Sequence, residues 1–243
     1  LHSTSRRQRQ MCIRDREICE EGENMSAVVQ LAKIKDTIKD YPNVRIVAAT
    51  KYFDIDKTKE IIDAGIKDIG ENRKDTFLAK YEAFKDLGIT WHYFGVIKIP
   101  PKLSPSFIDS IDFLHSLDSI DLANAINKVR KKTEPLKCFI QVNLSNNANK
   151  TGLNETRVIP FIKSLAKYEK IKVVGLMTIA TYTFDDEVLE NCFKTLKELQ
   201  TEVQALNLPY APCTELSMGM SNDYKLAVKY GATMIRIGTL LSK

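Results

Sequence analysis

The chain has 243 residues, of which 44% are hydrophobic and 28% charged, and its formal net charge is +5. This composition is typical of a globular protein with one large core, and the mild positive charge is spread along the chain, which argues against a nucleic-acid partner. No apolar run approaches the ~20 residues that cross a membrane, so no membrane partner is expected. The five cysteines form no CxxC pair. We therefore expect no disulfide framework, no zinc site and a cytoplasmic location.

Residues 1–24 differ from the rest of the sequence. They are polar, lack a sustained apolar period, contain no apolar core of a secretory signal, and precede Met25. We interpret them as a non-native extension and exclude them from the fold, with a disordered basic arm as the alternative. A single domain is expected over residues 25–243.

Helical and strand patterns alternate from Ser26 onward. A helix is expected over 26–40, where Leu31, Ile34 and Ile38 recur near a 3.6-residue period. Further helices are expected at 56–64, 74–86, 119–132, 155–169, 187–206 and 222–230, and residues of capping type occur near several helix starts, namely Asp54, Asp118, Asn154 and Asn222. Strands are expected at 45–50, 66–70, 91–95, 112–117, 138–143, 172–179, 214–218 and 233–238. The prolines at 100 and 101 predict an extended connection after the third strand.

The strand count predicts the fold class. Eight mostly apolar strands that alternate with helices indicate a parallel sheet, and eight is the number that closes a (β/α)8 TIM barrel. The N-terminal helix at 26–40 would precede this barrel. A doubly wound open sheet is the alternative.

Lys51 follows the first strand directly. Side-chain alternation places Val47, Ala49 and Lys51 on the same face of that strand. An inward lysine at the C-terminal end of a barrel strand lies where such barrels build their active sites. The alternative is a solvated surface lysine just past the strand.

The last two strands are followed by small and hydroxyl-bearing residues, which include Ser217, Ser221, Gly238 and Thr239. Barrel enzymes often hold a phosphate between these two loops through backbone N–H groups and a helix N-terminus. The alternative is an ordinary strand-to-helix turn that Ser221 or Asn222 caps. Neither GxxxxGK[ST] nor GxGxxG occurs, so the nucleotide-phosphate sites that those motifs build are not expected.

A lysine on the first strand, a phosphate cradle and an arginine on the eighth strand together suit pyridoxal 5′-phosphate (PLP). Lysine amines form Schiff bases with this cofactor, and we expect the Lys51 amine to be buried, which would favour its neutral, nucleophilic form. The guanidinium of Arg236 only donates hydrogen bonds, so facing the pyridine nitrogen it would keep that nitrogen unprotonated and weaken the ring as an electron sink. A salt bridge across the barrel rim is the alternative for Arg236.

Several segments together carry a family resemblance: VAATKY (47–52), IGENR (69–73), WHYFG (91–95), HSLDS (115–119), IQVNLSNNANKTG (140–152), GLMTI (175–179), LSMGMSNDYKLAVKYGAT (216–233) and IRIGT (235–239). The chain from about Ser26 to Leu241 resembles the pyridoxal phosphate homeostasis proteins, which are similar to the fold-type III PLP-binding barrel at the N-terminus of alanine racemase. The resemblance implies that PLP is the cofactor and that Lys51 is its Schiff-base lysine. It further implies that Arg236 faces the pyridine nitrogen, that Asn72 lines the ring, and that the phosphate is held by Ser217, Ser221, Gly238 and Thr239. The segments 96–102 and 240–243 depart from the usual family sequence.

Other polar residues have simpler interpretations. His92 and His115 lack acidic or cysteine partners at metal spacing, so we expect core or rim histidines and no metal site. Lys150 is either a second amine near the rim or a surface lysine of its loop.

The resemblance leaves a choice between a carrier and an enzyme. Racemisation through PLP needs an acid/base group on each face of the substrate, and in the racemases the second group is a tyrosine from a further domain of a partner subunit. The eight strands take up the sequence to its end, so we expect no such domain. We therefore expect a monomer that holds PLP as a lysine aldimine, acts in intracellular PLP homeostasis without substantial catalysis, and passes PLP to apo-enzymes. A PLP-dependent amino-acid racemase that uses Tyr52 or Tyr182 is the alternative, and a barrel for another phosphorylated metabolite is a third possibility.

Overall fold

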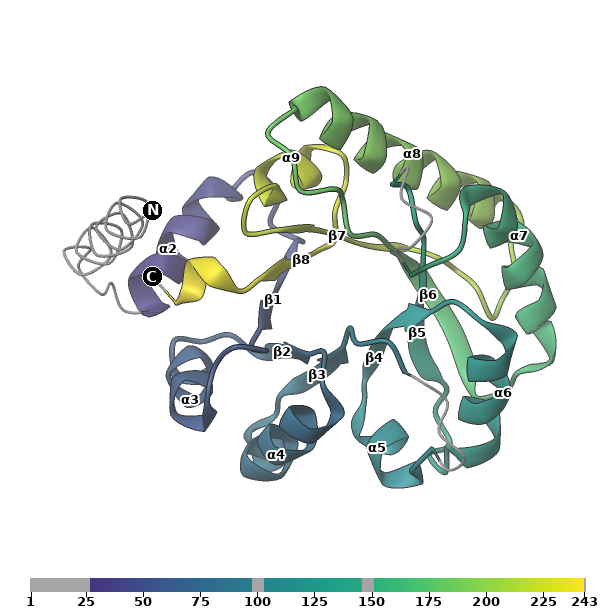
Figure 1. The fold of residues 1–243 in the computed structure, drawn as a ribbon, viewed down its shortest axis with the longest axis horizontal. Helices are drawn as coiled ribbons and strands as arrows, with labels where there is room; N and C mark the ends of the chain where they lie inside the picture. Colours follow the sequence, from purple (N-terminus) through teal and green to yellow (C-terminus); the bar gives the residue numbers. More distant parts are fainter. Residues whose placement is uncertain (1–26, 98–102, 146–150, 243) are drawn as a thin grey trace, which may run out of the picture.

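The computed structural model describes residues 27–97, 103–145 and 151–242. Within them, eight parallel strands form a closed barrel in chain order, with β1 paired to β8 (Figure 1). The strands are β1 (Arg45–Ala49), β2 (Asp68–Glu71), β3 (Thr90–Tyr93), β4 (Phe113–Leu117), β5 (Leu136–Gln141), β6 (Ile171–Met177), β7 (Glu215–Met220) and β8 (Met234–Ile237). The predicted (β/α)8 barrel is confirmed, and the open-sheet alternative is wrong because β1 and β8 close the ring.

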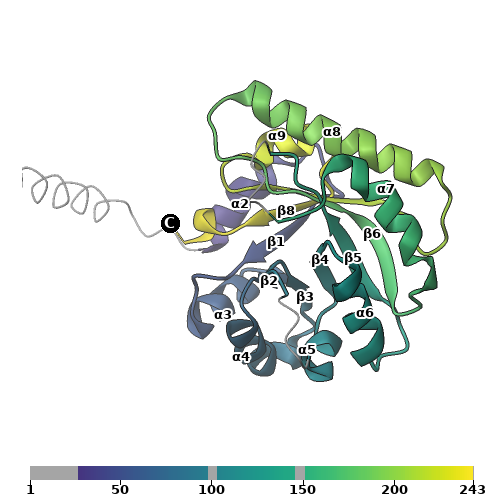
Figure 2. The same cartoon turned by 45° about the vertical axis from the view of Figure 1, so that its right-hand side comes forward.

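The helices lie outside the ring of strands (Figures 1 and 2). They are α2 (Ala27–Thr37), α3 (Ile55–Asp63), α4 (Lys74–Phe84), α5 (Pro105–Ser110), α6 (Ile120–Val129), α7 (Glu155–Ser164), α8 (Asp186–Ala205) and α9 (Tyr224–Lys229), with short 3-10 turns η1 (Lys85–Leu87), η2 (Leu165–Lys167) and η3 (Thr239–Leu241). The predicted N-terminal helix is α2, which contacts both α3 and η3. This helix thus covers the side of the barrel where the first and last strands meet.

Local signals explain where several elements begin. Asp54 caps α3 as predicted, since its carboxylate accepts from the Lys57 N–H at 2.8 Å. The cap of α6 is Ser119, whose hydroxyl accepts from the Leu122 N–H, so the expectation of Asp118 there is wrong. Helix α5 was not predicted, although Pro105 at its first turn is a favourable helix start.

The end of β7 also differs from the prediction. The strand continues to Met220, and α9 begins only at Tyr224 with Asp223 at its N-cap position, so Asn222 is not the cap. Ser217 lies within β7 and is buried in the barrel, below the rim.

The barrel interior holds apolar and polar side chains next to one another. Val47, Phe113, Phe139 and Met234 belong to a buried cluster inside the ring, while a larger cluster packs the strands against the helices. Alternation along β1, β3, β4 and β8 turns every second side chain inward. The inward side chains also include polar groups, and these build the site described below.

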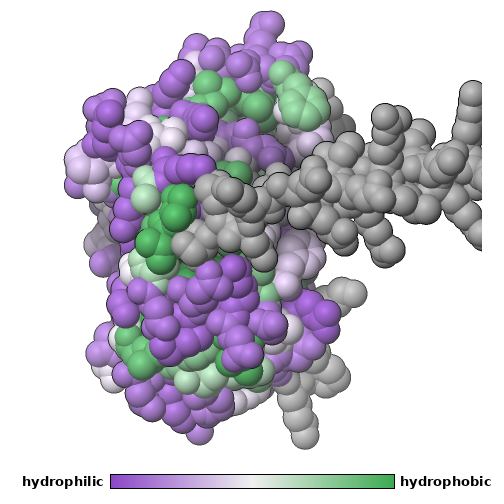
Figure 3. Space-filling model, turned by 90° about the vertical axis from the view of Figure 1, so that its left-hand side faces the viewer, coloured by the Kyte–Doolittle hydropathy of each residue, from purple (hydrophilic) through white to green (hydrophobic). Residues whose placement is uncertain are grey.

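The outer surface around α2 is hydrophilic over most of its area, with smaller hydrophobic areas between (Figure 3). Val28 and Val29 of α2 are exposed. Across the described residues, no helix has the length and apolar character that crossing a membrane would require. The proposed extension 1–24 lies outside the described residues, so the domain boundary at Met25 stays a prediction.

Candidate cofactor-binding site

Lys51 lies two residues beyond the end of β1, at the C-terminal rim of the barrel. Its side chain is exposed, and its Nζ lies 4.7 Å from the centroid of the Tyr52 ring. The expected burial of this amine is therefore wrong: β1 ends at Ala49, and the turn that follows carries Lys51 out to the rim. An amine in this position is accessible to an incoming aldehyde.

A buried ion pair fixes the backbone directly before Lys51. The Nζ of Lys80, on α4, donates to the backbone oxygen of Thr50 at 2.7 Å and pairs with the carboxylate of Glu71. The hydroxyl of Thr50 donates to the same carboxylate at 2.9 Å. The sequence analysis missed this cluster; the available signal was Lys80 within the face of α4 that also buries Phe77 and Phe84.

Arg236 lies inside the barrel and is almost fully buried. Its Nη1 donates to the backbone oxygen and the hydroxyl of Ser217, at 2.8 and 2.6 Å, and its Nη2 donates to the backbone oxygen of Thr178 at 2.8 Å. Burial lowers the pKa of Arg236 to about 10, against the opposing charge of Asp223, so the guanidinium stays protonated near neutral pH. The alternative of a salt bridge at the rim does not describe this geometry, since the described hydrogen bonds of Arg236 go to backbone and hydroxyl oxygens.

The hydroxyl of Ser217 is engaged below the rim. Besides accepting from Arg236, it lies 2.9 Å from the Nδ1 of His115. The predicted role of Ser217 in holding a phosphate stays a prediction, and the structure places its hydroxyl next to Arg236 rather than next to Ser221.

Ser221, Gly238 and η3 form a cradle at the rim. The hydroxyl oxygen of Ser221 accepts from the backbone N–H of Gly238 at 3.3 Å and from that of Leu240 at 3.4 Å. Both bonds are long, so these N–H groups can be redirected to a stronger acceptor such as a phosphate oxygen. Thr239, which is exposed, lies between the two donors in sequence. A cradle of two backbone donors and two hydroxyls suits an anion.

The cradle is next to the strand that leads to Lys51. Strand pairing sets Ala48 beside Ile237, and a Cβ added at Gly238 would lie 3.1 Å from the backbone oxygen of Ala49. The absence of a side chain at Gly238 thus permits close approach of the β8 loop to β1. The lysine and the anion cradle consequently belong to neighbouring strand ends.

Asn72 lies at the end of β2, where its side chain is exposed. Its backbone oxygen accepts from the hydroxyl of Tyr93 at 3.3 Å. This contact holds the β2 loop against β3, and the predicted role of Asn72 in lining the ring stays a prediction.

A cavity lies between Ser221 and α2. This cavity of about 610 Å³ is lined by Ser221 and Leu240, and its wall includes Tyr182 and Phe184. These two aromatic rings are 74% and 89% exposed. Lys150, the other amine suggested by the sequence, lies outside the described residues.

Comparison with known proteins identifies the family of this chain. The family described as alanine racemase, N-terminal domain, matches residues 30–243. A pyridoxal phosphate homeostasis protein of Aquifex aeolicus is 34% identical over 201 residues, which cover 81% of this chain and 85% of that protein. One from Schizosaccharomyces pombe is 33% identical over 203 residues, with 81% and 82% covered.

Solved structures show the same barrel. PipY of Synechococcus elongatus with PLP bound superposes with a TM-score of 0.77 at 29% identity, covering 90% of this chain and all of that one. Alanine racemase of Corynebacterium glutamicum, at 16% identity and a TM-score of 0.67, shares the fold over 88% of this chain and 60% of its own.

The fold and the site thus define a barrel of the class found in the N-terminal domain of alanine racemase, with a lysine at the end of β1 and an arginine on β8. Within that class, the chain belongs to the family of pyridoxal phosphate homeostasis proteins.

Proposed function

We propose that this protein binds PLP at the C-terminal rim of the barrel and acts in PLP homeostasis, with Lys51 as the residue that anchors the cofactor. The observation that carries the proposal is the buried guanidinium of Arg236, held within the barrel by three hydrogen bonds to Ser217 and Thr178. Burying a cation costs free energy unless polar groups bind it. Arg236 lies on β8, the strand that leads into the anion cradle.

The residues present fit the three polar parts of PLP. The cradle of Ser221, Gly238 and Thr239 suits the phosphate, Arg236 suits the ring nitrogen, and Lys51 suits the aldehyde. When bound, PLP supplies an aldehyde that forms a Schiff base with a lysine amine and a ring that accepts electrons. Asn72 is assigned to the ring, and Ser217, whose hydroxyl oxygen accepts from Arg236, is assigned to holding that guanidinium.

Arg236 sets the electronic character of such a site. The guanidinium only donates, and its pKa of about 10 keeps it charged near pH 7. A donor opposite the ring nitrogen competes with protonation of that nitrogen. A ring with an unprotonated nitrogen is a weaker electron sink, so this arrangement favours binding of the cofactor over catalysis.

The surroundings of Lys51 support a protein without substantial catalysis. A racemase needs a second acid/base group held on the other face of the substrate. The candidates for that group, Tyr52 and Tyr182, are 77% and 74% exposed. An exposed phenol is not held in one position, so the geometry favours holding and releasing PLP over turnover, with a PLP-dependent racemase as the alternative.

We further propose that the protein acts as a cytoplasmic monomer and that apo forms of PLP-dependent enzymes receive its cofactor. Every residue assigned to the site comes from one barrel, which supports a monomer. The buried, free thiols of Cys138 and Cys213 suit a reducing compartment.

The test is to titrate the full-length protein with PLP and to record its absorption spectrum, alongside assays for amino-acid racemisation and for transfer to an apo-enzyme. The proposal expects a new absorption band in the wild type, none in Lys51→Ala, transfer to the apo-enzyme, and negligible racemisation. Racemisation that is lost in Lys51→Ala would overturn the non-catalytic assignment. Without any PLP binding, a site for another phosphorylated metabolite becomes the better account.

A further inference from the structure

A continuous chain of hydrogen bonds crosses the barrel interior and ends at Arg236. The carboxylate of Asp68 lies 2.9 Å from the Nε2 of His92, and the Nδ1 of His92 lies 2.9 Å from the Nε2 of His115. The Nδ1 of His115 lies 2.9 Å from the hydroxyl of Ser217, which in turn accepts from Arg236 at 2.6 Å. These contacts join strands β2, β3, β4, β7 and β8.

The direction of every hydrogen bond follows from the Asp68 end. Burial raises the pKa of Asp68, but the hydrogen bond from His92 and the ion pair with Arg45 together lower it by more. The pKa of Asp68 therefore lies below its usual value. An ionised carboxylate only accepts. The Nε2 of His92 therefore carries the proton, and its Nδ1 accepts from the Nε2–H of His115.

The Arg236 end is compatible with the same direction. A guanidinium only donates, so the hydroxyl oxygen of Ser217 is the acceptor of that bond. The proton of the same hydroxyl is then free to donate to the Nδ1 of His115. In a neutral His115 whose Nε2 carries the proton, that Nδ1 is the acceptor. With both imidazoles neutral, each link has one donor and one acceptor.

Aromatic rings keep the two imidazoles in this neutral state. Phe113 stacks on His92 with ring centroids 4.9 Å apart, and Phe139 stacks on His115 at 4.4 Å. Burial lowers the pKa of His92, against the opposing effect of Asp68. Burial lowers the pKa of His115 further, together with the charge that His92 would carry if protonated and the charges of Arg236 and Arg45. Both histidines are fully buried, as expected for core histidines.

We propose that Asp68, His92, His115 and Ser217 form a tautomer relay that positions the guanidinium of Arg236 for the cofactor. The carboxylate of Asp68 fixes the His92 tautomer with its proton on Nε2, and His92 in turn fixes the His115 tautomer with its proton on Nε2. The Nδ1 of His115 then accepts from the Ser217 hydroxyl and orients it so that its oxygen faces Arg236. The inference rests on the proposed function, because Arg236 is assigned there to the ring nitrogen. These four are positioning residues, acting on the site through Arg236.

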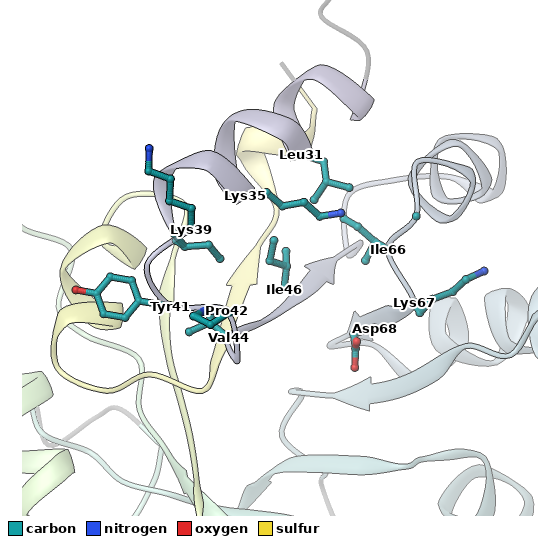
Figure 4. Close-up of a pocket in the computed structure, with 12 residues that line it drawn as sticks. Leu31, Lys35, Lys39, Tyr41, Pro42, Val44, Ile46, Ile66, Lys67 and Asp68 are labelled. Atoms are coloured by element: carbon teal, nitrogen blue, oxygen red, sulfur yellow. The ribbon is translucent and has the colours of Figure 1, made fainter.

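The relay reaches the surface at the opposite end of the barrel. Asp68 is at the start of β2, and it also lines a cavity of about 360 Å³ between α2 and strands β1 and β2, together with Lys35 and Lys67 (Figure 4). The side chains of Arg45 and Asp68 are 36% and 18% exposed. A change at this remote end is therefore expected to act on the cofactor site, without any contact of Asp68 with the cofactor.

The first test is nitrogen-15 NMR of the ligand-free, full-length protein labelled at its three histidines, with His92→Gln used to assign the signals. The relay predicts that His92 and His115 both carry their proton on Nε2 at neutral pH. A proton on Nδ1 of either ring overturns the relay, whatever the protein does with PLP.

The second test compares Asp68→Asn with the wild type. An amide both donates and accepts, so the proton of His92 is no longer confined to Nε2. The relay predicts that the His115 signals change and that PLP binds about five- to tenfold more weakly, the effect of about one hydrogen bond. His115 signals identical to the wild type in a folded Asp68→Asn protein would overturn the coupling.

A matched pair of serine variants separates positioning from burial. Ser217→Ala removes the link between His115 and Arg236, whereas Ser116→Ala removes a buried hydroxyl that donates to the Gly95 oxygen at 2.7 Å, outside the relay. We expect altered His115 signals and weaker PLP binding only in Ser217→Ala, and equal effects of the two variants would contradict the relay. If the wild type fails to bind PLP while the predicted tautomers are found, the proposed function fails and the relay stands.

Discussion

The side-chain amine of Lys80 lies 2.7 Å from the backbone oxygen of Thr50, the residue that directly precedes Lys51. This bond and the buried pair with Glu71 hold the end of β1 in place. The position of Lys51, the proposed anchoring residue, thus depends on a second lysine on α4 whose amine is engaged by Thr50 and Glu71.

Replacing Lys80 by Met is expected to destabilise the protein by about 3–5 kcal/mol, because the carboxylate of Glu71 would be left buried without its partner. The double variant Glu71→Met, Lys80→Met removes both charges and is expected to lose less stability than Lys80→Met alone. Urea unfolding measures both. As a control, Lys85→Met breaks an exposed Lys–Glu pair at 2.6 Å and should leave unfolding unchanged; an equal loss from Lys80→Met and Lys85→Met would contradict the role of the buried pair.

Ser221→Ala is expected to weaken PLP binding about tenfold, because the variant loses a hydroxyl that is placed to bond a charged phosphate. Pyridoxal, which lacks the phosphate, serves as the matched ligand. Its affinity should be unaffected by the change. If the affinities for PLP and pyridoxal fall equally, the cradle does not hold the phosphate.

Gly219→Ala and Gly231→Ala test the close packing of β7 against α9. Both glycines have φ near +90°, but a Cβ at Gly219 would lie 2.6 Å from the Cβ of Ala227, whereas the nearest atom at Gly231 is 3.6 Å away. The left-handed backbone destabilises both variants by about 1–2 kcal/mol. Thermal unfolding should show a larger loss, by at least about 1 kcal/mol, for Gly219→Ala because of the overlap. A larger loss from Gly231→Ala would show that the close packing at Gly219 is not limiting.

Stability is expected to fall as the pH drops below about 6.5, where histidines of the unfolded chain become protonated. His92 and His115 have lowered pKa values in the folded state, so they stay neutral while the unfolded chain takes up protons. Each histidine contributes up to about 1.4 kcal/mol per pH unit until its folded-state pKa is reached.

Chemical unfolding between pH 5.5 and 7 measures this slope. Burial raises the pKa values of Asp118 and Asp223 in the folded state, so their effect on stability has the opposite pH dependence to that of the histidines. This effect lies nearer to the pH range in which ordinary carboxyl groups titrate. The double variant His92→Gln, His115→Gln should remove most of the slope. A slope that persists in the double variant would show that other groups cause it.

Much of the framework could be predicted from apolar runs and alternation. The end of β1 predicts Lys51 at the C-terminal rim, although alternation along this strand wrongly predicts an inward, buried side chain. The loops after the last two strands suggest a cradle, and Ser221 and Gly238 are in contact there. These signals are local, because they depend on neighbouring residues of one strand or turn.

The interior could not be predicted in the same way. The bond between His115 and Ser217 joins residues 102 positions apart, across the barrel from β4 to β7, and no local pattern specifies it. The extra length of β7 likewise depends on its pairing with β8, which continues to Met220 opposite Arg236 after a register shift. Ser217 therefore lies three residues before the end of β7 and is buried inside the barrel, not at the rim.

The most direct test of the account is to reduce the PLP-loaded full-length protein with borohydride, digest it, and locate the modified lysine by mass spectrometry. The account predicts a single phosphopyridoxyl group on Lys51, and no stoichiometric label elsewhere when Lys51 is replaced by Arg. A label on another lysine in the wild type, or an equal yield of label in Lys51→Arg, would contradict the assignment of Lys51 as the anchoring residue.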